Sequence, residues 1–383
     1  MRLSGALLLA AALLGASLPA GAAEAPRELG AAQRPAAVQL IQALTGDKAL
    51  FPRLAYLCDT FGPRLSGSAN LERALDWIID QMRRDGLATA HGEPVQVTHW
   101  VRGSESATLL LPREQPLAIL GLGGSVGTPA EGLTADAVVV HSFAELDERP
   151  ERVRGKIVVF VPPFTDYEQT VPYRVHGAVR AAAHGAVAVL TRSITPYSLG
   201  APHTGAMVYK LQDGTAALPK LPSAAISVEG AELLSRLQQR GERLRLRLRL
   251  RMGAATLAES PSRNVVAELR GSEHPEEVVV FGGHIDSWDV GQGAQDDAGS
   301  CVAAWHALLA MQRLGLRPRR TIRLVLWTNE ENGRAGAKAY AKAHAADHHV
   351  LAIEADGGIF RPTGWSFSGA PATLSSVPTP STR

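Results

Sequence analysis

From residue 260 onward, short apolar runs alternate with longer stretches in which apolar residues recur at helical spacing. The runs predict strands and the longer stretches predict helices, in the order strand 278–281, helix 298–314, strand 322–327, helix 335–344 and strand 350–353. Strands and helices that alternate in this way form a parallel sheet with helices on its faces. Because ligands bind beyond the carboxyl ends of such strands, we expect the functional residues there.

Each of these three strands ends in residues that bind divalent cations. His284 and Asp286 end the first and lie two residues apart, so on an extended backbone they face the same way. The glycines before His284 let the backbone lie close to whatever occupies the site. The candidate residues at the three strand ends are His284, Asp286, Asp296, Glu330, Glu331 and Asp356.

One imidazole among several carboxylates predicts a metal site. This donor set suits Zn²⁺, and similar sites take Co²⁺ or Mn²⁺. Carboxylates gathered without basic partners repel one another and take up protons, so a dication is their natural neutraliser. A single acidic residue at a strand end is usually a solvated loop residue, and Glu330-Glu331 alone is compatible with an acidic helix start. The joint pattern at three successive strand ends favours the metal site.

The same residues resemble a known family. The run GHIDSWDVGQGAQDD at residues 283–297 resembles the metal-binding segment of M28-family metallopeptidases, LVLWTNEE at 324–331 its catalytic glutamate pair, and EAD at 354–356 its later aspartate. The likeness extends upstream to GPRLSGS at 62–68 and PHTG at 202–205. It implies a zinc-exopeptidase fold, which is a mixed, mainly parallel sheet flanked by helices.

The resemblance also implies roles for individual residues. His284 and Asp356 would bind one zinc ion, Asp296 would bridge two, and Glu331 would bind the second. Glu330 would be the general base, and Asp286 would orient His284. The implied reaction is hydrolysis of dipeptides or small peptides by a metal-activated water, in an enzyme that resembles carboxypeptidases and dipeptidases and forms a homodimer.

One element of the family pattern is missing. The family has a further histidine ligand well beyond the aspartate that matches Asp356, whereas the residues after Asp356 include no histidine, and the likeness fades after Gly369. A truncated or frame-shifted chain would explain this difference. We therefore expect the second metal ion to bind weakly and the activity of this chain to be impaired.

The rest of the chain divides by pattern. Arg2, an apolar run and small residues predict a secretory signal peptide over residues 1–22, and hence a secreted or periplasmic protein without a membrane span. The further expected parts are a helical N-terminal part of the peptidase unit at 23–92, a β-rich protease-associated-like insertion at 93–255, an incomplete metallopeptidase domain at 256–369 and a disordered tail at 370–383. The insertion rests on a resemblance of GKIVV at 155–159 to protease-associated domains.

A basic stretch within the insertion predicts a strand. From residue 244 to 252 leucine alternates strictly with arginine, which is typical of a half-buried strand with a solvated face. A nucleic-acid surface is the alternative, but the net charge of the chain is only +2, and phosphate binding needs a concentrated basic surface.

Three other functions compete with a metallopeptidase. GGSVG at residues 123–127 matches the nucleophile motif of serine hydrolases, but the residues after it do not begin a convincing helix. A glutaminyl cyclase on the same fold would need only one zinc ion, and neither the protease-associated-like insertion nor the intact Glu330-Glu331 pair supports it. A non-catalytic M28-like binding protein would be expected to lose Glu330. The two cysteines, Cys58 and Cys301, exclude a disulfide scaffold and a thiolate zinc module, and whether they pair stays open.

Overall fold

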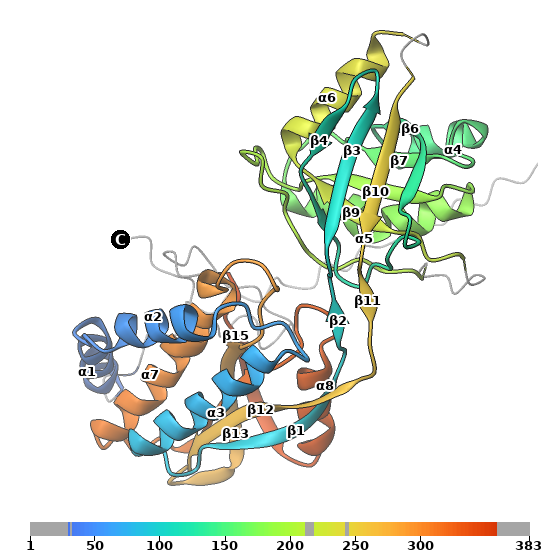
Figure 1. Cartoon of the computed structure of the whole chain (residues 1–383). Helices are drawn as coiled ribbons and strands as arrows, with labels where there is room; N and C mark the ends of the chain where they lie inside the picture. The colour runs from blue at the N-terminus through green and yellow to red at the C-terminus, as the bar shows by residue number, and fades with distance from the viewer. Residues whose placement is uncertain (1–29, 31–32, 211–217, 242–244, 358–383) are drawn as a thin grey trace, which may run out of the picture. The chain divides into compact units, whose positions relative to one another are not determined.

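The computed structural model describes residues 30, 33–210, 218–241 and 245–357 (Figure 1). The chain divides into a large unit, Leu40–Ile359, and a small one made of both end segments, Met1–Gln39 and Phe360–Arg383. Of the small unit, the structure describes little more than the first residues of helix α1 (Arg34–Thr45). The expected signal peptide and tail lie outside the described residues. None of the described helices is long and apolar enough to cross a membrane.

A five-stranded mixed sheet forms the centre of the peptidase part. Its order is β1 (His91–Val97), β12 (Ser260–Leu269), β14 (Arg320–Trp327), β13 (His274–His284) and β15 (His348–Glu354). Strands β14, β13 and β15 are parallel, as the alternation of strands and helices predicts, whereas β12 is antiparallel to both β1 and β14. The sheet is therefore mixed, with its parallel half on the side that carries the candidate residues.

Helices cover both faces of this sheet because its strands are apolar on both sides. Alternate residues point to opposite faces, so Leu324 and Leu326 of β14 pack in one core cluster and Val325 and Trp327 in another. The first cluster includes helices α2 (Leu50–Phe61), α3 (Ala69–Arg84) and α7 (Gly299–Arg313), and the second includes Tyr340 of α8 (Ala335–Ala343).

Helix α3 shows how local sequence defines such an element. The Ser68 side chain caps it by accepting a hydrogen bond from the Leu71 amide at 3.2 Å. Its buried residues recur at helical spacing on one face: Leu71, Ala74, Leu75, Ile78, Ile79 and Met82. The helix therefore begins where the capping residue and the apolar stripe predict.

The second sheet lies in the insert, by which we mean residues 100–256. Short strands β2 (Trp100–Val101) and β11 (Ala255–Thr256) pair where the chain enters and leaves it (Figure 1). The sheet has eight strands in the order β4 (Gln115–Leu117), β3 (Glu105–Leu111), β10 (Arg247–Met252), β6 (Leu133–Val140), β7 (Ile157–Phe160), β8 (Ala188–Arg192), β9 (Ser223–Ile226) and β5 (Ile119–Gly121). Helix α6 (Val228–Gln239) packs on one face, and α4 (Phe143–Glu148) and α5 (Tyr167–Ala183) pack on the other, with a 3₁₀ turn at Pro150–Arg152.

Strand β10 confirms the interpretation of the leucine–arginine alternation. Leu248 and Leu250 are fully buried, whereas Arg249 and Arg251 are exposed. The predicted start of the insertion at residue 93 differs from the structure, because residues 93–97 belong to β1 and pair with β12 in the peptidase sheet. The predicted helical part, which extends to residue 92, is also too long, since β1 begins at His91.

Candidate metal centre

The register of three parallel strands brings the candidate residues to one edge of the sheet. His284, the last residue of β13, lies beside Trp327, the last residue of β14. On the other side of β13, Gly282 lies beside Glu354, where β15 ends. The residues that follow β14 and β15 therefore reach the same place as His284.

Two glycines at the end of β13 leave room for atoms of β14 and of Asp297 to approach closely. A Cβ atom at Gly282 would lie 1.7 Å from the carbonyl oxygen of Val325, and one at Gly283 would lie 2.2 Å from Oδ2 of Asp297. Both distances are far below van der Waals contact. Glycine is thus required at both positions by space.

His284 lies at the middle of the centre and is almost fully buried. Its Nε2 lies 3.0 Å from Oδ1 of Asp296 and 3.2 Å from Oδ1 of Asp356. Its Nδ1 lies 2.9 Å from the main-chain carbonyl of Asp286 and is assigned as a donor to that oxygen, which directs Nε2 at the carboxylates. Burial lowers the pKa of His284, but the hydrogen bonds to Asp296 and Asp356 outweigh it and raise the pKa to about 12. The surroundings therefore strongly favour a positive charge here.

Two carboxylates beside His284 have an oxygen with no partner. Oδ1 of Asp297 and Oε1 of Glu331 are buried without a hydrogen bond. Burial raises the pKa of Asp297 to about 7, and burial together with the charge of Asp296 raises that of Glu331 to about 8. Such oxygens are costly to bury unless something positive satisfies them.

The ligand atoms form two groups that share one residue. One atom from each of His284, Asp296 and Glu331 lies within 4.8 Å of the others, and the same holds for His284, Asp297 and Asp356. Imidazole and carboxylate oxygens at these separations, with two orphaned oxygens among them, fit a divalent cation such as zinc. The four predicted ligands thus meet, as expected for one centre.

The two adjacent glutamates differ in their surroundings. Glu331 turns inward to the ligand group, whereas Glu330 belongs to neither group and accepts a hydrogen bond from Nε of Arg334 at 3.2 Å. The Glu330 side chain is 27% exposed, so solvent and a bound molecule can reach it.

Asp286 acts on the centre by a different route from the one predicted. Its carboxylate accepts hydrogen bonds from the amides of Glu330 at 3.0 Å and Glu331 at 3.4 Å, and from the Ser66 hydroxyl at 3.2 Å. Its Oδ1 lies 3.9 Å from Nδ1 of His284, which is too far for a hydrogen bond. The group that orients His284 is the main-chain carbonyl of Asp286, and its side chain positions the two glutamates.

Sequence reasoning missed Arg64 and Asp297. Arg64 is fully buried, and its guanidinium donates to the carbonyls of Ile285 at 3.1 Å, Gln292 at 2.8 Å and Gly293 at 2.9 Å. It therefore holds the loop between His284 and Asp296. The signals were the resemblance at residues 62–68 for Arg64 and the Asp-Asp pair for Asp297.

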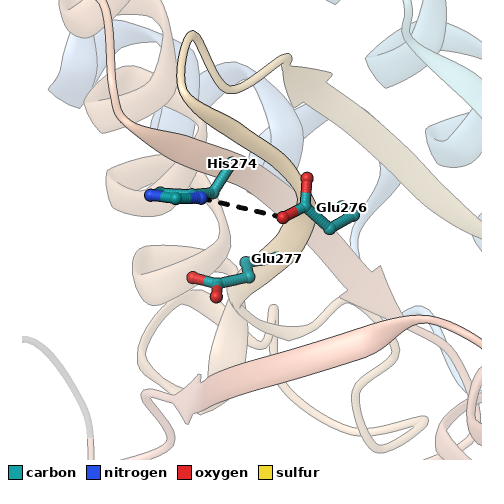
Figure 2. Close-up of side chains that lie close together, drawn as sticks. All are labelled: His274, Glu276 and Glu277. Atoms are coloured by element: carbon teal, nitrogen blue, oxygen red, sulfur yellow. Dashed lines mark ion pairs between the residues drawn. The ribbon is translucent and has the colours of Figure 1, made fainter.

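A second group of histidine and glutamate lies at the other end of β13. Figure 2 shows His274, Glu276 and Glu277 there, with Nδ1 of His274 3.7 Å from Oε1 of Glu276. Glu277 is already paired with Nε of Arg320, Glu276 is exposed and His274 is partly exposed. The group lies at the opposite end of the strand from His284 and is not part of the centre.

The serine motif holds no nucleophile. Ser125 is fully buried, and its hydroxyl accepts a hydrogen bond from the Ser223 amide at 2.8 Å and donates to the carbonyl of Val126. No helix follows it within the described residues 126–142. The cysteines are both buried free thiols, and the Cys301 thiol donates to the main-chain carbonyl of His284.

The centre opens into a cleft of about 870 Å³ within the large unit. One wall comes from the peptidase part and includes Trp288, Glu330 and Arg334. The other wall comes from the insert and includes Tyr167, Arg174, His203–Met207 and Val208. A bound molecule would therefore contact both.

Comparisons with known proteins agree with this geometry. The model of peptidase family M28 matches residues 264–378. Carboxypeptidase Q of Mus musculus is 51% identical over 322 residues, which are 84% of this chain and 67% of that protein. The crystal structure of a peptidase M28 precursor from Shewanella amazonensis is 35% identical with a TM-score of 0.78, over 85% of this chain and 74% of that one.

A more distant likeness concerns the fold alone. A zinc aminopeptidase from Bacillus subtilis has a TM-score of 0.60 at 19% identity, over 82% of this chain and 69% of that one. The extent and identity of the match to carboxypeptidase Q decide the family. The chain therefore belongs to peptidase family M28 and, with that family, to the metallopeptidases.

Proposed function

We propose that the chain is a zinc-dependent exopeptidase that hydrolyses dipeptides or other small peptides. The observation that carries the proposal is the arrangement around His284, where two groups of carboxylates converge while Glu330 stays outside them. Its similarity to carboxypeptidase Q supports an exopeptidase. The cleft volume of about 870 Å³ lies within the usual range for small-molecule sites.

The residues that would hold zinc follow from the family resemblance, and the two ligand groups agree with it in part. By the resemblance His284 and Asp356 would hold one ion, Glu331 would hold a second, and Asp296 would serve both. The groups contain Asp296 with His284 and Glu331, and Asp297 with His284 and Asp356, so Asp297 offers a further oxygen beside Asp356. When bound, zinc supplies Lewis acidity, which lowers the pKa of water and polarises a carbonyl group. The number of ions per chain stays a prediction, which zinc counting by atomic emission on the purified protein tests.

Glu330 is the residue that moves the proton. Its carboxylate accepts a proton from water in the cleft and passes it to the leaving amine of the peptide. Asp286 positions Glu330 through the Glu330 amide, and Arg334 holds the Glu330 carboxylate by an ion pair. The main-chain carbonyl of Asp286 keeps His284 in the tautomer whose Nε2 faces the carboxylates.

The remaining features of the proposal concern where the protein works and what surrounds its site. The predicted signal peptide at residues 1–22 supports secretion or a periplasmic location. We assign the insert to the protease-associated type on its sequence resemblance. A homodimer stays a prediction of the family resemblance.

The substitution Glu330→Gln tests the proposal. Glutamine keeps the size of the side chain but cannot take up a proton, so kcat for a dipeptide should fall about 10²–10⁴-fold. The zinc content should not change, because Glu330 lies outside both ligand groups. The matched control is Glu276→Gln, which removes a largely exposed carboxylate at the far end of β13.

Two outcomes would contradict the proposal. An unchanged kcat in Glu330→Gln would exclude Glu330 as the general base. A wild-type chain that holds two zinc ions and cleaves no small peptide would contradict the exopeptidase activity itself, whereas a chain that holds only one ion should be impaired, as the missing histidine predicts.

A further inference from the structure

Arg174 of helix α5 is a buried cation without a counter-ion. Its side chain lies in the wall that the insert contributes to the cleft, and the residue is only 9% exposed. Its Nη1 donates to the carbonyl of Thr204 at 3.0 Å and its Nη2 to the Tyr167 hydroxyl at 3.0 Å. Its Nε is buried and has no hydrogen-bond partner. Among the described residues no carboxylate pairs with it.

The backbone beside Arg174 is shaped to admit the guanidinium. A Cβ atom at Gly205 would lie 2.2 Å from Cζ and 2.3 Å from Nη1 of Arg174, and Gly205 has a φ of +143°, which other residues rarely adopt. Gly205 thus provides space that any other residue would fill. The guanidinium has a built position in the cleft wall.

An uncompensated charge at such a place favours an anionic ligand. Burying a charge without an ionised partner is unfavourable in proteins, even after the surroundings relax. Neutral partners already occupy two of the five N–H groups of Arg174. The planar guanidinium matches a carboxylate, which can accept two parallel hydrogen bonds.

Arg174 and the metal centre line the same cleft. Asp296, Glu330 and Glu331 contribute to one wall, and Arg174 and His203 to the other. His203 lies within electrostatic reach of both sides: burial and Arg174 lower its pKa, while Asp296 opposes them. A small molecule in the cleft can therefore meet both at once.

We propose that Arg174 binds the terminal carboxylate of the peptide substrate and so determines that the enzyme acts on peptides with a free carboxyl end. The inference rests on the proposed function, since it names the substrate group that the same cleft recognises. Tyr167 and Thr204 hold the guanidinium in place and leave one further N–H group on each of Nη1 and Nη2 for the anion. The scissile carbonyl then lies between this anchor and the metal centre.

The activity arm compares a dipeptide with its amide. For alanyl-leucine against alanyl-leucinamide, the wild-type chain should show a kcat/KM ratio of about 100 or more, because the amide leaves the guanidinium without its anion. Arg174→Met should bring the ratio close to one by slowing only the acid. Arg174→Lys keeps the charge but not the planar fork, so its ratio should lie between these values.

The matched control is Arg180→Met on the same helix. Arg180 is 37% exposed and pairs with Asp147, away from the cleft. The Arg180→Met substitution removes the same charge and should leave the ratio of kcat/KM between acid and amide unchanged. Circular dichroism and thermal unfolding identify a variant that fails to fold, and Arg174→Lys then carries the test.

A binding arm separates this inference from the proposed function. Isothermal titration measures the affinity of the full chain for leucine and for leucinamide, both with zinc and after zinc removal. The comparison distinguishes a carboxylate bound by arginine from one bound by metal. In both states the wild type should prefer leucine, and Arg174→Met should lose the preference. If that holds while no peptide is cleaved, the exopeptidase proposal fails and the role of Arg174 stands.

Three results would overturn the role of Arg174. The first is an acid-to-amide ratio near one in the wild type. The second is a ratio that Arg174→Met and Arg174→Lys leave intact. The third is a preference for an acidic side chain, measured with alanyl-glutamic acid α-amide. Arg174→Met would have to remove that preference, while the choice between a free and an amidated carboxyl end has no effect on kcat/KM.

Discussion

His284 is the residue that both ligand groups share. One group joins it to Asp296 and Glu331, and the other joins it to Asp297 and Asp356. Its Nε2 faces these carboxylates because its Nδ1 bonds to a main-chain carbonyl. Removing this one imidazole therefore affects every carboxylate of the centre.

We predict that His284→Ala loses most of its bound zinc. Without the imidazole, each group keeps only carboxylates, whose mutual repulsion favours protonation over metal binding. Atomic emission on the dialysed protein measures this, and zinc per chain should fall to a small fraction of the wild-type value. The control His274→Ala alters the partly exposed histidine at the other end of β13, and this variant should keep its zinc. Equal zinc in His284→Ala and wild type would exclude His284 as a ligand.

At this scale the sequence predicted which residues meet but not how each is used. His284, Asp296, Glu331 and Asp356 come together because parallel strands bring their carboxyl ends to one edge. The role of Asp297 was not predictable, because which of two adjacent aspartates turns inward depends on local backbone angles. Asp296 has φ −122° and ψ 90°, and Asp297 has φ −134° and ψ 33°, so neither has helical backbone angles.

At the scale of elements, a polar network joins α8 to the sheet. Arg323 of β14 donates to Asp347 at 2.7 Å, to Glu268 of β12 at 3.0 Å and to the Tyr340 hydroxyl at 3.1 Å. His344, which follows α8, bonds to Asp347 at 2.9 Å and to Glu93 of β1 at 3.0 Å. These groups satisfy one another at the amino end of β15, so His344 has a structural role there.

The Arg323–Asp347 pair predicts a dependence of stability on pH. The hydrogen bond from Arg323 lowers the pKa of Asp347 below its ordinary value of 3.8. Its ionised form therefore stabilises the fold above that value, and the contribution is lost as pH falls through the lowered pKa. We expect Asp347→Asn to reduce the free energy of unfolding by about 1 kcal/mol at neutral pH, since the side chain is one-third exposed.

Urea denaturation of wild type and Asp347→Asn across a pH series measures this contribution. The difference in unfolding free energy should be constant near neutrality and shrink in strong acid. Asp80→Asn, at an exposed position on α3, is the control and should change little at any pH. A difference that persists in strong acid would mean that Asp347 stabilises the fold by something other than its charge.

Most elements were predictable because their patterns are local. The alternation in β10 and the capped apolar stripe of α3 each define their element without help from distant residues. Strand β1 was missed because Gly92 and Pro94 interrupt any alternation. Proline is tolerated there since β1 is an edge strand, which is a property of the assembled sheet.

At the scale of the whole molecule, the insert contacts the loop between β13 and Asp296 through Arg102. Its Nε donates to Oδ2 of Asp289 at 2.9 Å, its Nη2 contacts Oδ1 of Asp289 and the Thr204 hydroxyl, and its Nη1 bonds to the carbonyl of Gly121. Trp100 packs edge-on against Trp288, with ring centroids 6.4 Å apart. Thr204 and Trp288 both line the cleft, so this contact sets the relation between its two walls.

We predict that Asp289→Asn weakens substrate binding more than it slows chemistry. The change leaves the buried Arg102 without an ionised partner, and a loss of about 1.4 kcal/mol corresponds to a tenfold weaker complex. KM for a small peptide should rise about tenfold, while kcat and zinc content change little. Glu273→Gln, at an exposed carboxylate of the peptidase part, should leave KM unchanged. A fall in zinc content would instead place the effect in the loop between β13 and Asp296.

The cleft itself could not be predicted from the sequence. Its two walls come from stretches about a hundred residues apart, such as Arg174 and His284, and no local pattern relates them. The sequence predicted an insertion and a metal site separately. Only the folded chain shows that the insertion forms part of the site.

The division of the cleft between two parts of the chain has a consequence for how such enzymes diverge. In the proposed mechanism, bond breaking depends on His284 and on residues that follow β13, β14 and β15, where Gly282 and Gly283 leave no space for a side chain. In the same proposal, the choice of peptide depends on side chains of the insert, whose sheet has core clusters of its own. Mutations in the insert can therefore change substrate specificity one residue at a time, while the residues of the metal centre are inherited unchanged.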